Sequence, residues 1–428
     1  MPRRLIGLLP ETSFLRKLSI LASGTVLGQA LVILSSPLLT RLFTPAEFGL
    51  FAVFAGLAGI VGGLAGLRYE FAIPVMETDD DAAALTVVAV LAGLLTTLVL
   101  ASLIWAFGAW FADMVNTPAL GPWLWLLPPA VLVWGLGSAL TYWSVRRRTY
   151  KINAVNRTLQ LGSQAGSQVG LGFLGTGGVG LIMGYTLGYV VRFGHFLYRL
   201  PAADRRLLTT QPLDTLWRRA RDNWRYPVFG FPSAAFQSIC QHAPAILLAA
   251  LYGPMLAGFY ALSQRIMGLP VRMLSEAGAK VFIGEIRDIE SAHLHRYFMR
   301  ITFLFLSIGL VGALPLIFYA PQLFAFVFGQ PWLQSGEITR LLIPLYLSKF
   351  LEQPVSIILY YFNKQHLHFI STAINFTALI ASFSIGHIFS LEAHTTILIF
   401  SLTSGASFLI TLMISWRLAH RANIVRPA

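Results

Sequence analysis

Charged residues and cysteines are scarce in this sequence, and each shortage excludes a class of protein. Only 11% of the 428 residues are charged, whereas a soluble domain usually has about a quarter of its residues charged. The single cysteine, Cys240, excludes a disulfide framework and a cysteine metal site. The sequence also contains no residues at the spacing of a metal site, no phosphate-binding loop motif and no nucleophile-elbow motif. We therefore expect no metal and no cofactor, and we predict that the protein is not an enzyme.

Apolar residues, by contrast, make up 56% of the chain and gather in long runs. A helix of about 20 apolar residues crosses a bilayer, so such runs predict transmembrane helices. The predicted fold class is an all-α polytopic membrane protein with about 12 transmembrane helices. The predicted spans are 18–39, 48–67, 83–111, 123–145, 157–175, 179–199, 228–251, 255–282, 298–319, 338–361, 367–389 and 394–416.

Basic residues outnumber acidic ones and give the chain a net charge of +13. If the N-terminus is cytoplasmic, most of them belong to cytoplasmic loops, as the positive-inside rule requires. The basic residues predicted to lie in cytoplasmic loops include Arg157 and the eight arginines from Arg192 to Arg225. Membrane topology thus explains the charge without a nucleic-acid partner. We expect both termini to be cytoplasmic, with residues 1–17 as an interfacial segment.

Two charged stretches depart from an even distribution. The motif "RRRTYK" (146–151) and the arginines of 201–226 are expected to meet anionic lipid headgroups. The stretch "METDDDAAA" (76–84) is acidic although it lies on the side predicted to be basic. Acidic residues contribute little to the positive-inside rule, so this exception does not change the predicted topology.

Two distant stretches repeat one pattern. "LFTPAEFGLFA" (42–52) and "LYGPMLAGFYA" (251–261) agree in their aromatic, proline, glycine and alanine positions at an offset of 209. The chain therefore divides into an N-terminal six-helix bundle, an arginine-rich cytoplasmic linker and a C-terminal six-helix bundle. Because six is even, the bundles enter from the same side, which implies a pseudo-two-fold axis along the membrane normal. The predicted boundaries are 1–200, 201–226 and 227–428.

Proline and glycine in the repeated pattern have structural explanations. Pro45 and Pro254 suit the first position of a helix. Gly49 and Gly258 allow neighbouring backbones to approach. Glycines at spacing four favour close packing of helices in lipid, and these are Gly59, Gly63, Gly162, Gly166, Gly170, Gly180, Gly184 and Gly188.

Two longer stretches resemble a known family. "SGTVLGQALVILSSPLLTRLFTPAEFGLFAVFAGLAGIVGGLAGLRYEFAI" is similar to the N-terminal half of polysaccharide-type flippases of the multidrug/oligosaccharidyl-lipid/polysaccharide exporter superfamily. "AGFYALSQRIMGLPVRMLSEAGAKVFIGEI" is similar to the start of their second half. The resemblance implies two six-helix bundles that open alternately to each side of the bacterial inner membrane. It also implies a cargo, the undecaprenyl-diphosphate-linked repeat unit of O-antigen (lipopolysaccharide) or capsule, and a place beside glycosyltransferases and a polymerase.

Ionisable residues inside a span are costly and are functional candidates by default. The span 255–282 carries Arg265, Arg272 and Glu276 at spacings that keep them within a narrow arc of one helix. Arginine binds phosphate oxygens with two bonds from its planar fork, so we predict that Arg265 and Arg272 hold the diphosphate. Glu276 and Glu352 are the candidates for coupling transport to a proton or sodium gradient.

Neutral polar residues complete the predicted site. Gln29 in the first span, and Gln237 and Gln241 in the seventh, supply amides that suit sugar hydroxyls. Hydrogen bonding between helices is an equal alternative for each of them. Arg41 and Arg68 mark helix ends, as gate residues or as interface anchors.

Other functions agree with parts of this pattern. A cation-coupled multidrug exporter of the same superfamily often uses acidic residues in its first lobe, but the spans of helix one and helices three to six contain none. A flippase of peptidoglycan precursors usually has more helices. A membrane-embedded polysaccharide polymerase is expected to expose a large external loop with catalytic carboxylates, and the longest predicted external loop, 320–337, offers only Glu337. We therefore favour the polysaccharide-type flippase.

Overall fold

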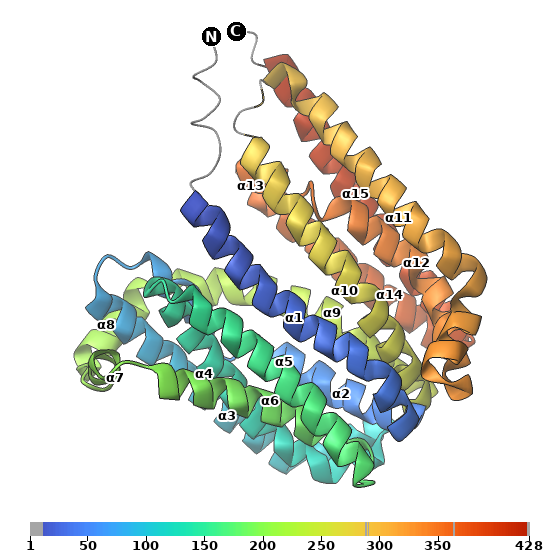
Figure 1. Cartoon of the computed structure of the whole chain (residues 1–428), viewed down its shortest axis with the longest axis horizontal. Coiled ribbons are helices and arrows are strands. Elements are labelled where there is room, and N and C mark those ends of the chain that lie inside the picture. Colours follow the sequence, from blue (N-terminus) through green and yellow to red (C-terminus); the bar gives the residue numbers. More distant parts are fainter. Residues whose placement is uncertain (1–11, 287–288, 290, 363, 426–428) are drawn as a thin grey trace. The chain divides into compact units, whose positions relative to one another are not determined.

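The protein is helical throughout the part of the chain that the structure describes (Figure 1). The computed structural model describes residues 12–286, 289, 291–362 and 364–425, and these contain no β-strand. The prediction of an all-α protein is confirmed. Residues 1–11 of the expected interfacial segment lie outside the described residues.

Two compact units make up the chain. Unit 1 consists of Met1–Phe43 and Phe54–Ala235, and unit 2 consists of Thr44–Val53 and Phe236–Ala428. The stretch predicted as a linker, 201–226, folds as part of unit 1. The long helices that begin in the first half of the chain are α1 (Thr12–Leu42), α2 (Pro45–Gly62), α3 (Asp79–Met114), α4 (Leu127–Arg146), α5 (Tyr150–Phe173) and α6 (Gly178–Arg199). Shorter elements are η1 (Tyr69–Phe71), η2 (Ile73–Val75), η3 (Pro118–Leu126), α7 (Ala202–Thr209), α8 (Leu213–Asp222) and η4 (Tyr226–Gly230).

The second half of the chain repeats the count of long helices. They are α9 (Phe231–Tyr252), α10 (Pro254–Glu285), α11 (Ser291–Phe328), α12 (Leu333–Glu352), α14 (Gln365–Ile388) and α15 (Ala393–Val425). Two short elements, η5 (Gln330–Trp332) and α13 (Ile358–Tyr361), flank α12. The twelve long helices of the described residues each overlap one predicted span, which confirms the predicted fold class.

Two predicted boundaries are wrong. The external loop expected at 320–337 is helical apart from a break around Gly329, because α11 continues through Pro315 and Pro321. The tenth span was expected to run to 361, but α12 ends at Glu352.

Helix composition separates the long helices into two groups. Seven helical segments of the described chain are long and apolar enough to cross a membrane, namely Pro45–Gly62, Asp79–Met114, Pro118–Arg146, Tyr226–Tyr252, His293–Phe328, His366–Ile388 and Ala393–Arg421. The described apolar part of α1, Val26–Leu42, is shorter, and the other four long helices, α5, α6, α10 and α12, are less apolar. Because lipid cannot satisfy polar groups, these four helices are where internal polar sites are expected.

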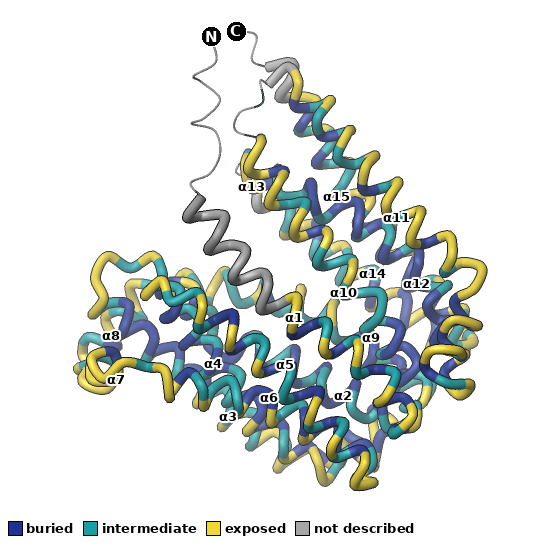
Figure 2. The backbone as a smooth tube through the Cα atoms, in the orientation of Figure 1, coloured by how far each residue is buried: buried dark blue, intermediate teal, exposed yellow. Residues whose placement is uncertain are grey.

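Many residues along α11 are exposed (Figure 2). Large apolar side chains are among the exposed residues of α3 and α11: Trp105 on α3 is 79% exposed, and Phe326 on α11 is 84% exposed. Such extensive apolar surface is unusual for a protein surrounded by water. It is the expected surface of helices that face lipid chains.

The repeated sequence pattern meets its own copy inside unit 2. A Cβ atom at Gly49 would overlap the carbonyl oxygen of Pro254, and a Cβ atom at Gly258 would overlap that of Pro45. The contact is therefore reciprocal, and it brings the first turn of α2 against the first turn of α10. This confirms that the two glycines allow backbones to approach, and it shows that they approach each other.

Local interactions fix where α2 begins. Thr44 and Glu47 form a capping box: the Thr44 backbone N–H donates to Glu47 Oε2 over 2.7 Å, and the Glu47 N–H donates to Thr44 Oγ1 over 3.4 Å. The next residue, Phe48, packs edge-on against the buried ring of Trp332, with ring centroids 4.8 Å apart. Phe259, next to Gly258, contacts the same indole at 6.0 Å.

The glycines at spacing four do not all behave alike. Gly184 and Gly188 on α6 lie directly against α5, where a Cβ atom would crowd Gln168 or Gln164. By contrast, Gly166 and Gly170 on α5 are exposed and have no described atom within 4 Å of an added Cβ. The prediction of close packing is correct for the α6 glycines and wrong for these two.

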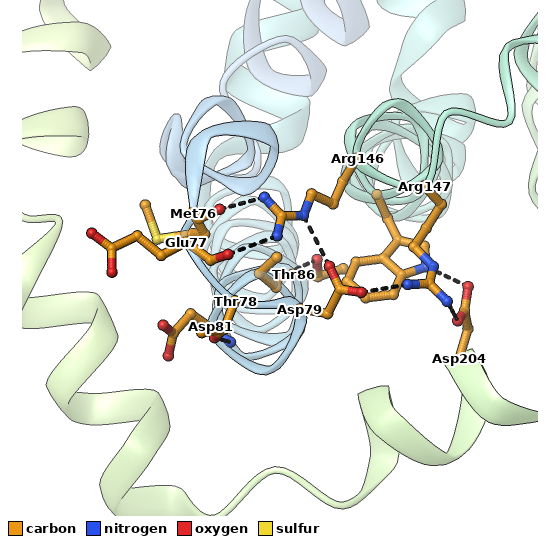
Figure 3. A network of polar contacts seen from close by, with 11 residues as sticks. Met76, Glu77, Thr78, Asp79, Asp81, Thr86, Arg146, Arg147 and Asp204 are labelled. Atoms are coloured by element: carbon orange, nitrogen blue, oxygen red, sulfur yellow. Dashed lines mark hydrogen bonds and ion pairs between the residues drawn. The ribbon is translucent and has the colours of Figure 1, made fainter.

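The acidic stretch at 76–84 provides the counter-charges for the "RRRTYK" motif (Figure 3). Asp79 accepts hydrogen bonds from Arg146 Nε over 3.0 Å and from an Arg147 nitrogen over 2.5 Å. Arg147 also pairs with Asp204 of α7 over 2.9 Å, and the Trp143 indole N–H donates to Asp204 over 3.1 Å. Both Arg146 and Arg147 therefore have carboxylate partners within unit 1, and contact of the motif with lipid headgroups stays a prediction.

The loop after α2 contains a buried carboxylate. Leu67 and Arg68 both adopt positive φ angles, 48° and 68°, a conformation that costs non-glycine residues energy. This turn directs Glu70 into unit 1, where it is 3% exposed and its Oε2 has no hydrogen-bond partner among the described residues. Burial raises the pKa of Glu70, and the backbone hydrogen bond and the charge of Arg68 offset that effect only in part.

We expect Gly49→Ala to destabilise the protein, because its methyl group would meet backbone atoms that have no rotamer to adopt. Overpacking of this kind costs about 1–3 kcal/mol. Thermal unfolding and size-exclusion chromatography of the purified protein measure the effect. The matched control is Gly166→Ala, which adds the same methyl group in open space. Equal melting temperatures for the two variants would contradict the proposed contact.

We expect Glu70→Gln to change how stability depends on pH. Because the folded-state pKa of Glu70 is raised, its contribution to stability is fully present below the unfolded pKa of about 4.3 and is lost as the pH rises through the folded value. Glutamine keeps the shape but does not ionise, so the variant should gain melting temperature relative to the native protein between about pH 4.5 and pH 8. Parallel melting curves across this range would show that the carboxylate is not held in a desolvated site.

Candidate functional site

A polar cavity of about 270 Å³ lies inside unit 2. Side chains from α9, α10, α12, α14 and α15 line it, and α10 and α12 belong to the more polar group of long helices. The lining includes several hydroxyl groups and five neutral amides, which are Gln237, Gln241, Gln264, Gln353 and Asn375. Amides and hydroxyls both donate and accept hydrogen bonds, so the cavity is suited to an uncharged polar ligand.

Helical periodicity explains why these side chains meet. Gln237 and Gln241 are four residues apart, and so share one face of α9. On α14, the lining residues His368, Thr372 and Asn375 recur at spacings of four and three. Between α9 and α10, the Gln264 side-chain amide donates to the backbone carbonyl of Gln241 over 3.1 Å, which orients both helices at the cavity wall.

One lysine and one glutamate of α12 belong to the same lining. Glu352 is only 6% exposed, and Lys349 is one turn away. No direct ion pair within 4.0 Å joins these two described residues. The Lys349 ammonium instead lies 6.0 Å from the centroid of the Phe408 ring, at cation–π distance. Arg272 and Glu352 are both near enough to act on the Lys349 charge. The cavity therefore combines neutral amides with a lysine and a glutamate whose charges influence each other.

The structure places three of the predicted site residues at this cavity. Gln237, Gln241 and Glu352 line it. Arg265 follows the lining residue Gln264 on α10 but is not itself part of the lining, and Arg272 reaches the cavity only through its proximity to Lys349. Substrate contact by any of these residues stays a prediction.

The other predicted residues lie elsewhere. Gln29 is buried on α1, and Arg41 is exposed at the end of the same helix. The Arg68 guanidinium carbon lies 4.7 Å from the centroid of the Phe71 ring, over its face. This contact favours the role of an anchor for Arg68 over that of a gate residue. Glu276 is exposed on α10. None of these four residues is part of the lining of the unit 2 cavity.

Sequence reasoning missed several of the lining residues. Gln264, Gln353 and Asn375 were not predicted, although each lies one helical turn or less from another polar residue. The polar stripe of α14 was the available signal, since His368, Thr372 and Asn375 recur at helical spacing inside an apolar span. Within the described residues no group of three or more histidine, cysteine or carboxylate side chains has the arrangement of a metal site.

Unit 1 contains a second internal polar region, between α5 and α6. Gln160, Gln164 and Gln168 follow one another at spacing four on α5, and all three are buried. The Gln168 amide donates to the Leu181 carbonyl of α6 over 2.9 Å. The glycines of α6 make room for this ladder, because a side chain at Gly184 would occupy the position of Gln168.

The sequence profile of the family described as "Polysaccharide biosynthesis protein" matches residues 38–337. The chain belongs to this family of polysaccharide biosynthesis proteins. The match covers α2–α11 completely and includes both copies of the repeated pattern. It confirms the resemblance to polysaccharide-type flippases that the sequence indicated.

Solved structures show the same fold at low sequence identity. The lipid II flippase MurJ in an inward closed conformation superposes with a TM-score of 0.73 at 12% identity, covering 93% of this chain and 87% of MurJ. An inward-facing multidrug resistance MATE family transporter of the MOP superfamily gives 0.67 at 15% identity, covering 93% and 96%. A MOP superfamily transporter from Pyrococcus furiosus, described as having a binding pocket of reverse polarity, gives 0.58 at 16% identity, covering 95% of each chain.

The comparison with curated protein sequences finds no match. The family therefore rests on the profile match, and the fold rests on the structural neighbours. Together they show a multi-pass membrane protein of the polysaccharide biosynthesis family that shares its fold with MurJ and with the MATE transporter.

We expect Lys349 and Glu352 to be energetically coupled. Lys349→Met leaves the Glu352 carboxylate buried without its nearest cation, so this variant should unfold at a lower temperature than the native protein. Adding Glu352→Gln removes the orphaned charge and should restore part of the loss, with a coupling free energy of about 0.5–3 kcal/mol. Unfolding of the purified single and double variants measures the coupling. Strictly additive effects, or an equal loss in the exposed control Lys364→Met, would contradict it.

Proposed function

We propose that this family member is a flippase for undecaprenyl-diphosphate-linked oligosaccharide repeat units. The observation that supports this function best is the unit 2 cavity, where neutral amides and hydroxyls gather inside a bundle of membrane helices. Sugar hydroxyls are donors and acceptors of the same kind, so the neutral amides and hydroxyls of the lining bind them without requiring a counter-charge. The family of the chain, polysaccharide biosynthesis, agrees with such a cargo.

The size of the cavity limits what it takes. At about 270 Å³, it is slightly smaller than the ~300–1,000 Å³ of common ligand pockets. It therefore accommodates part of a repeat unit, such as one sugar ring, rather than a complete oligosaccharide. Tyr260 and Tyr346 add aromatic faces to the wall, and aromatic rings pack against the apolar face of a sugar.

The charged headgroup requires a different environment from the sugars. Arg265 and Arg272 of α10 keep their predicted role as ligands of the diphosphate, since arginine stays charged and grips phosphate oxygens bidentately. Arg265 lies on α10, the helix that also supplies Gln264 and Tyr260 to the cavity wall. In the proposed cycle the lipid chain stays in the bilayer while the protein opens alternately to each side of the inner membrane.

A buried carboxylate supports a second element of the proposal. Glu352 is the acidic residue of the cavity, and it is the better candidate for coupling to a proton or sodium gradient because Glu276 is exposed. The same carboxylate is the one feature that favours the alternative function, a cation-coupled multidrug exporter. In either case we propose that the protein transports its ligand without covalent chemistry.

The proposed surroundings follow from the cargo. The protein would lie in the bacterial inner membrane with both termini cytoplasmic, beside glycosyltransferases that complete the lipid-linked unit and a polymerase that consumes it. Anionic lipids are proposed partners of the arginines that lack carboxylate partners on α8, such as the exposed Arg218. The product would be O-antigen, capsule or another surface polysaccharide.

We expect Arg265→Ala to abolish surface polysaccharide in a deletion strain without removing the protein from the membrane, and Arg265→Lys to restore part of it. Gln241→Ala should lower polymer by removing one sugar contact, and lipid-linked intermediates should accumulate inside the cell. Polymer staining and analysis of lipid-linked intermediates measure both effects. Lys280→Ala, an exposed charge on the same helix, is the control. Normal polymer in the Arg265→Ala strain would remove the assignment of Arg265, and normal polymer in the deletion strain would remove the function.

A further inference from the structure

The short helix α8 has an apolar face that the rest of unit 1 covers only in part. At about 100° per residue, Leu213, Leu216, Trp217 and Ala220 lie within an arc of roughly 100° around the helix axis. Leu216 is buried and Ala220 is partly buried, whereas Leu213 is 81% exposed and Trp217 is 75% exposed. One half of this apolar face is therefore packed, and the other half is open.

The packed half lies against the first turns of α3. Leu216 forms one buried cluster with Ala84 and Val88 of α3, and Ala220 packs against the same cluster. Ala84 and Val88 are five and nine residues after Asp79, where α3 begins. At 1.5 Å per residue, α8 therefore contacts α3 about 8–14 Å from the start of that helix.

Polar contacts fix α8 in this position. A terminal guanidinium nitrogen of Arg219 pairs with Asp81 of α3 over 2.6 Å. The Tyr69 hydroxyl, from η1, donates to the backbone carbonyl of Ala220 over 3.2 Å. Two neighbouring segments of unit 1 thus hold α8, and together with Leu216 they determine which side of the helix stays open.

The face of α3 that binds α8 continues as an exposed apolar stripe. Ala84 and Val88 are followed at helical spacing by Leu91, Leu95 and Leu98, and these three leucines are exposed. Because α3 is long and apolar enough to cross a membrane, its exposed leucines form the surface expected to face lipid chains. α8 therefore covers the first turns of a stripe whose remainder faces lipid, and it lies where the lipid begins.

The open half of the apolar face suits this boundary. Trp217 carries a large ring with one polar N–H group, and tryptophan is enriched where hydrocarbon meets headgroups. Leu213 is one turn away on the same side and has no polar atom in its side chain. A short helix with such a face and a charged opposite face typically lies in the plane of the membrane interface.

The charged side of the same segment carries a small positive excess. Three exposed arginines, Arg218, Arg221 and Arg225, stand beside two exposed aspartates, Asp214 and Asp222. Arginine side chains can extend along an apolar surface and place their charge among headgroups. A positive excess near the membrane surface favours anionic headgroups over neutral ones.

We infer that α8 is an interfacial helix that inserts Leu213 and Trp217 into the cytoplasmic leaflet beside α3, with its arginines among anionic headgroups. The cytoplasmic side and the class of lipid rest on the proposed function, whereas the insertion rests on the packing of α8 against α3. Since α8 is clamped to α3, this contact sets the depth of unit 1 in the bilayer. The lipid surface is a partner distinct from the cargo.

The test measures the depth of single positions in the full chain. In a Cys240→Ala background, which removes the only cysteine, Trp217→Cys, Leu98→Cys and Asp222→Cys are each labelled with bimane and reconstituted into phosphatidylcholine–phosphatidylglycerol vesicles. Nitroxide lipids then quench the label from a position near the headgroup or near the chain end. Leu98→Cys is the lipid-facing control on α3, and Asp222→Cys is the control on the charged side of α8.

We expect the shallow nitroxide to quench the label of Trp217→Cys about twice as strongly as that of Asp222→Cys, relative to vesicles without nitroxide. The deep nitroxide should quench Leu98→Cys most. Leu213→Cys repeats the measurement, so the test does not depend on one variant being folded. Equal quenching at positions 217 and 222 overturns the insertion. So does a label at position 217 that responds to protein concentration and not to nitroxide lipid, which would assign the open face to a second copy of the chain.

A second measurement tests the class of lipid. Nitroxide phosphatidylglycerol should quench the label at position 217 more than nitroxide phosphatidylcholine does, and the double variant Arg218→Gln/Arg221→Gln should remove this difference. Arg199→Gln, an exposed arginine of α6, is the matched control and should keep it. Equal quenching by the two lipids in the protein with native arginines overturns the anionic partner. No cargo is present in these vesicles, so either failure leaves the proposed transport function untouched.

Discussion

The reciprocal contact of Gly49 and Gly258 is the constraint on which much of unit 2 depends. Each glycine faces the carbonyl oxygen of the proline that begins the opposite helix, so no side chain can occupy either position. The contact fixes α2 against α10, and the neighbouring Phe48 and Phe259 both reach the ring of Trp332. Because α10 also supplies part of the polar cavity, the geometry of the candidate site is linked to this backbone approach.

A second constraint is the surrounding lipid. The acyl chains of lipids form no hydrogen bonds, so polar side chains within the spans must find partners inside the protein. The long helices divide accordingly: α3 and α11 present large apolar side chains outward, whereas the more polar α5, α6, α10 and α12 contribute to internal polar regions. Unit 1 contains a glutamine ladder with two arginines, and unit 2 contains a cavity rich in amides.

The positive charge of the chain has three different structural explanations. Arg146, Arg147 and Arg219 are paired with aspartates of the acidic stretch and of the neighbouring short helices. Others, such as Arg218 on α8, are exposed and free to meet lipid headgroups. Arg157 and Arg192 lie within α5 and α6, and both donate to the side-chain oxygen of Gln160 within unit 1. Arginine therefore pairs with aspartates, is exposed at the surface, or joins two helices through an amide, according to where its helix places it.

The sequence by itself determined the all-helical membrane class, the twelve spans and the repeated pattern. These features depend on the length and composition of local apolar runs, and the thickness of the bilayer fixes the length that such a run needs. It also indicated Gln237, Gln241 and Glu352 as functional candidates, since polar residues in apolar runs stand out. Tertiary structure alone decided that Gly49 faces Gly258, that Gln264 and Asn375 share a cavity with Lys349, and that Arg157 and Arg192 meet at Gln160. Those pairings depend on which faces of distant helices pack together. A helix of mixed polarity could pack against its neighbours through more than one face. Its own sequence therefore does not determine which face is packed until the neighbouring helices are in place.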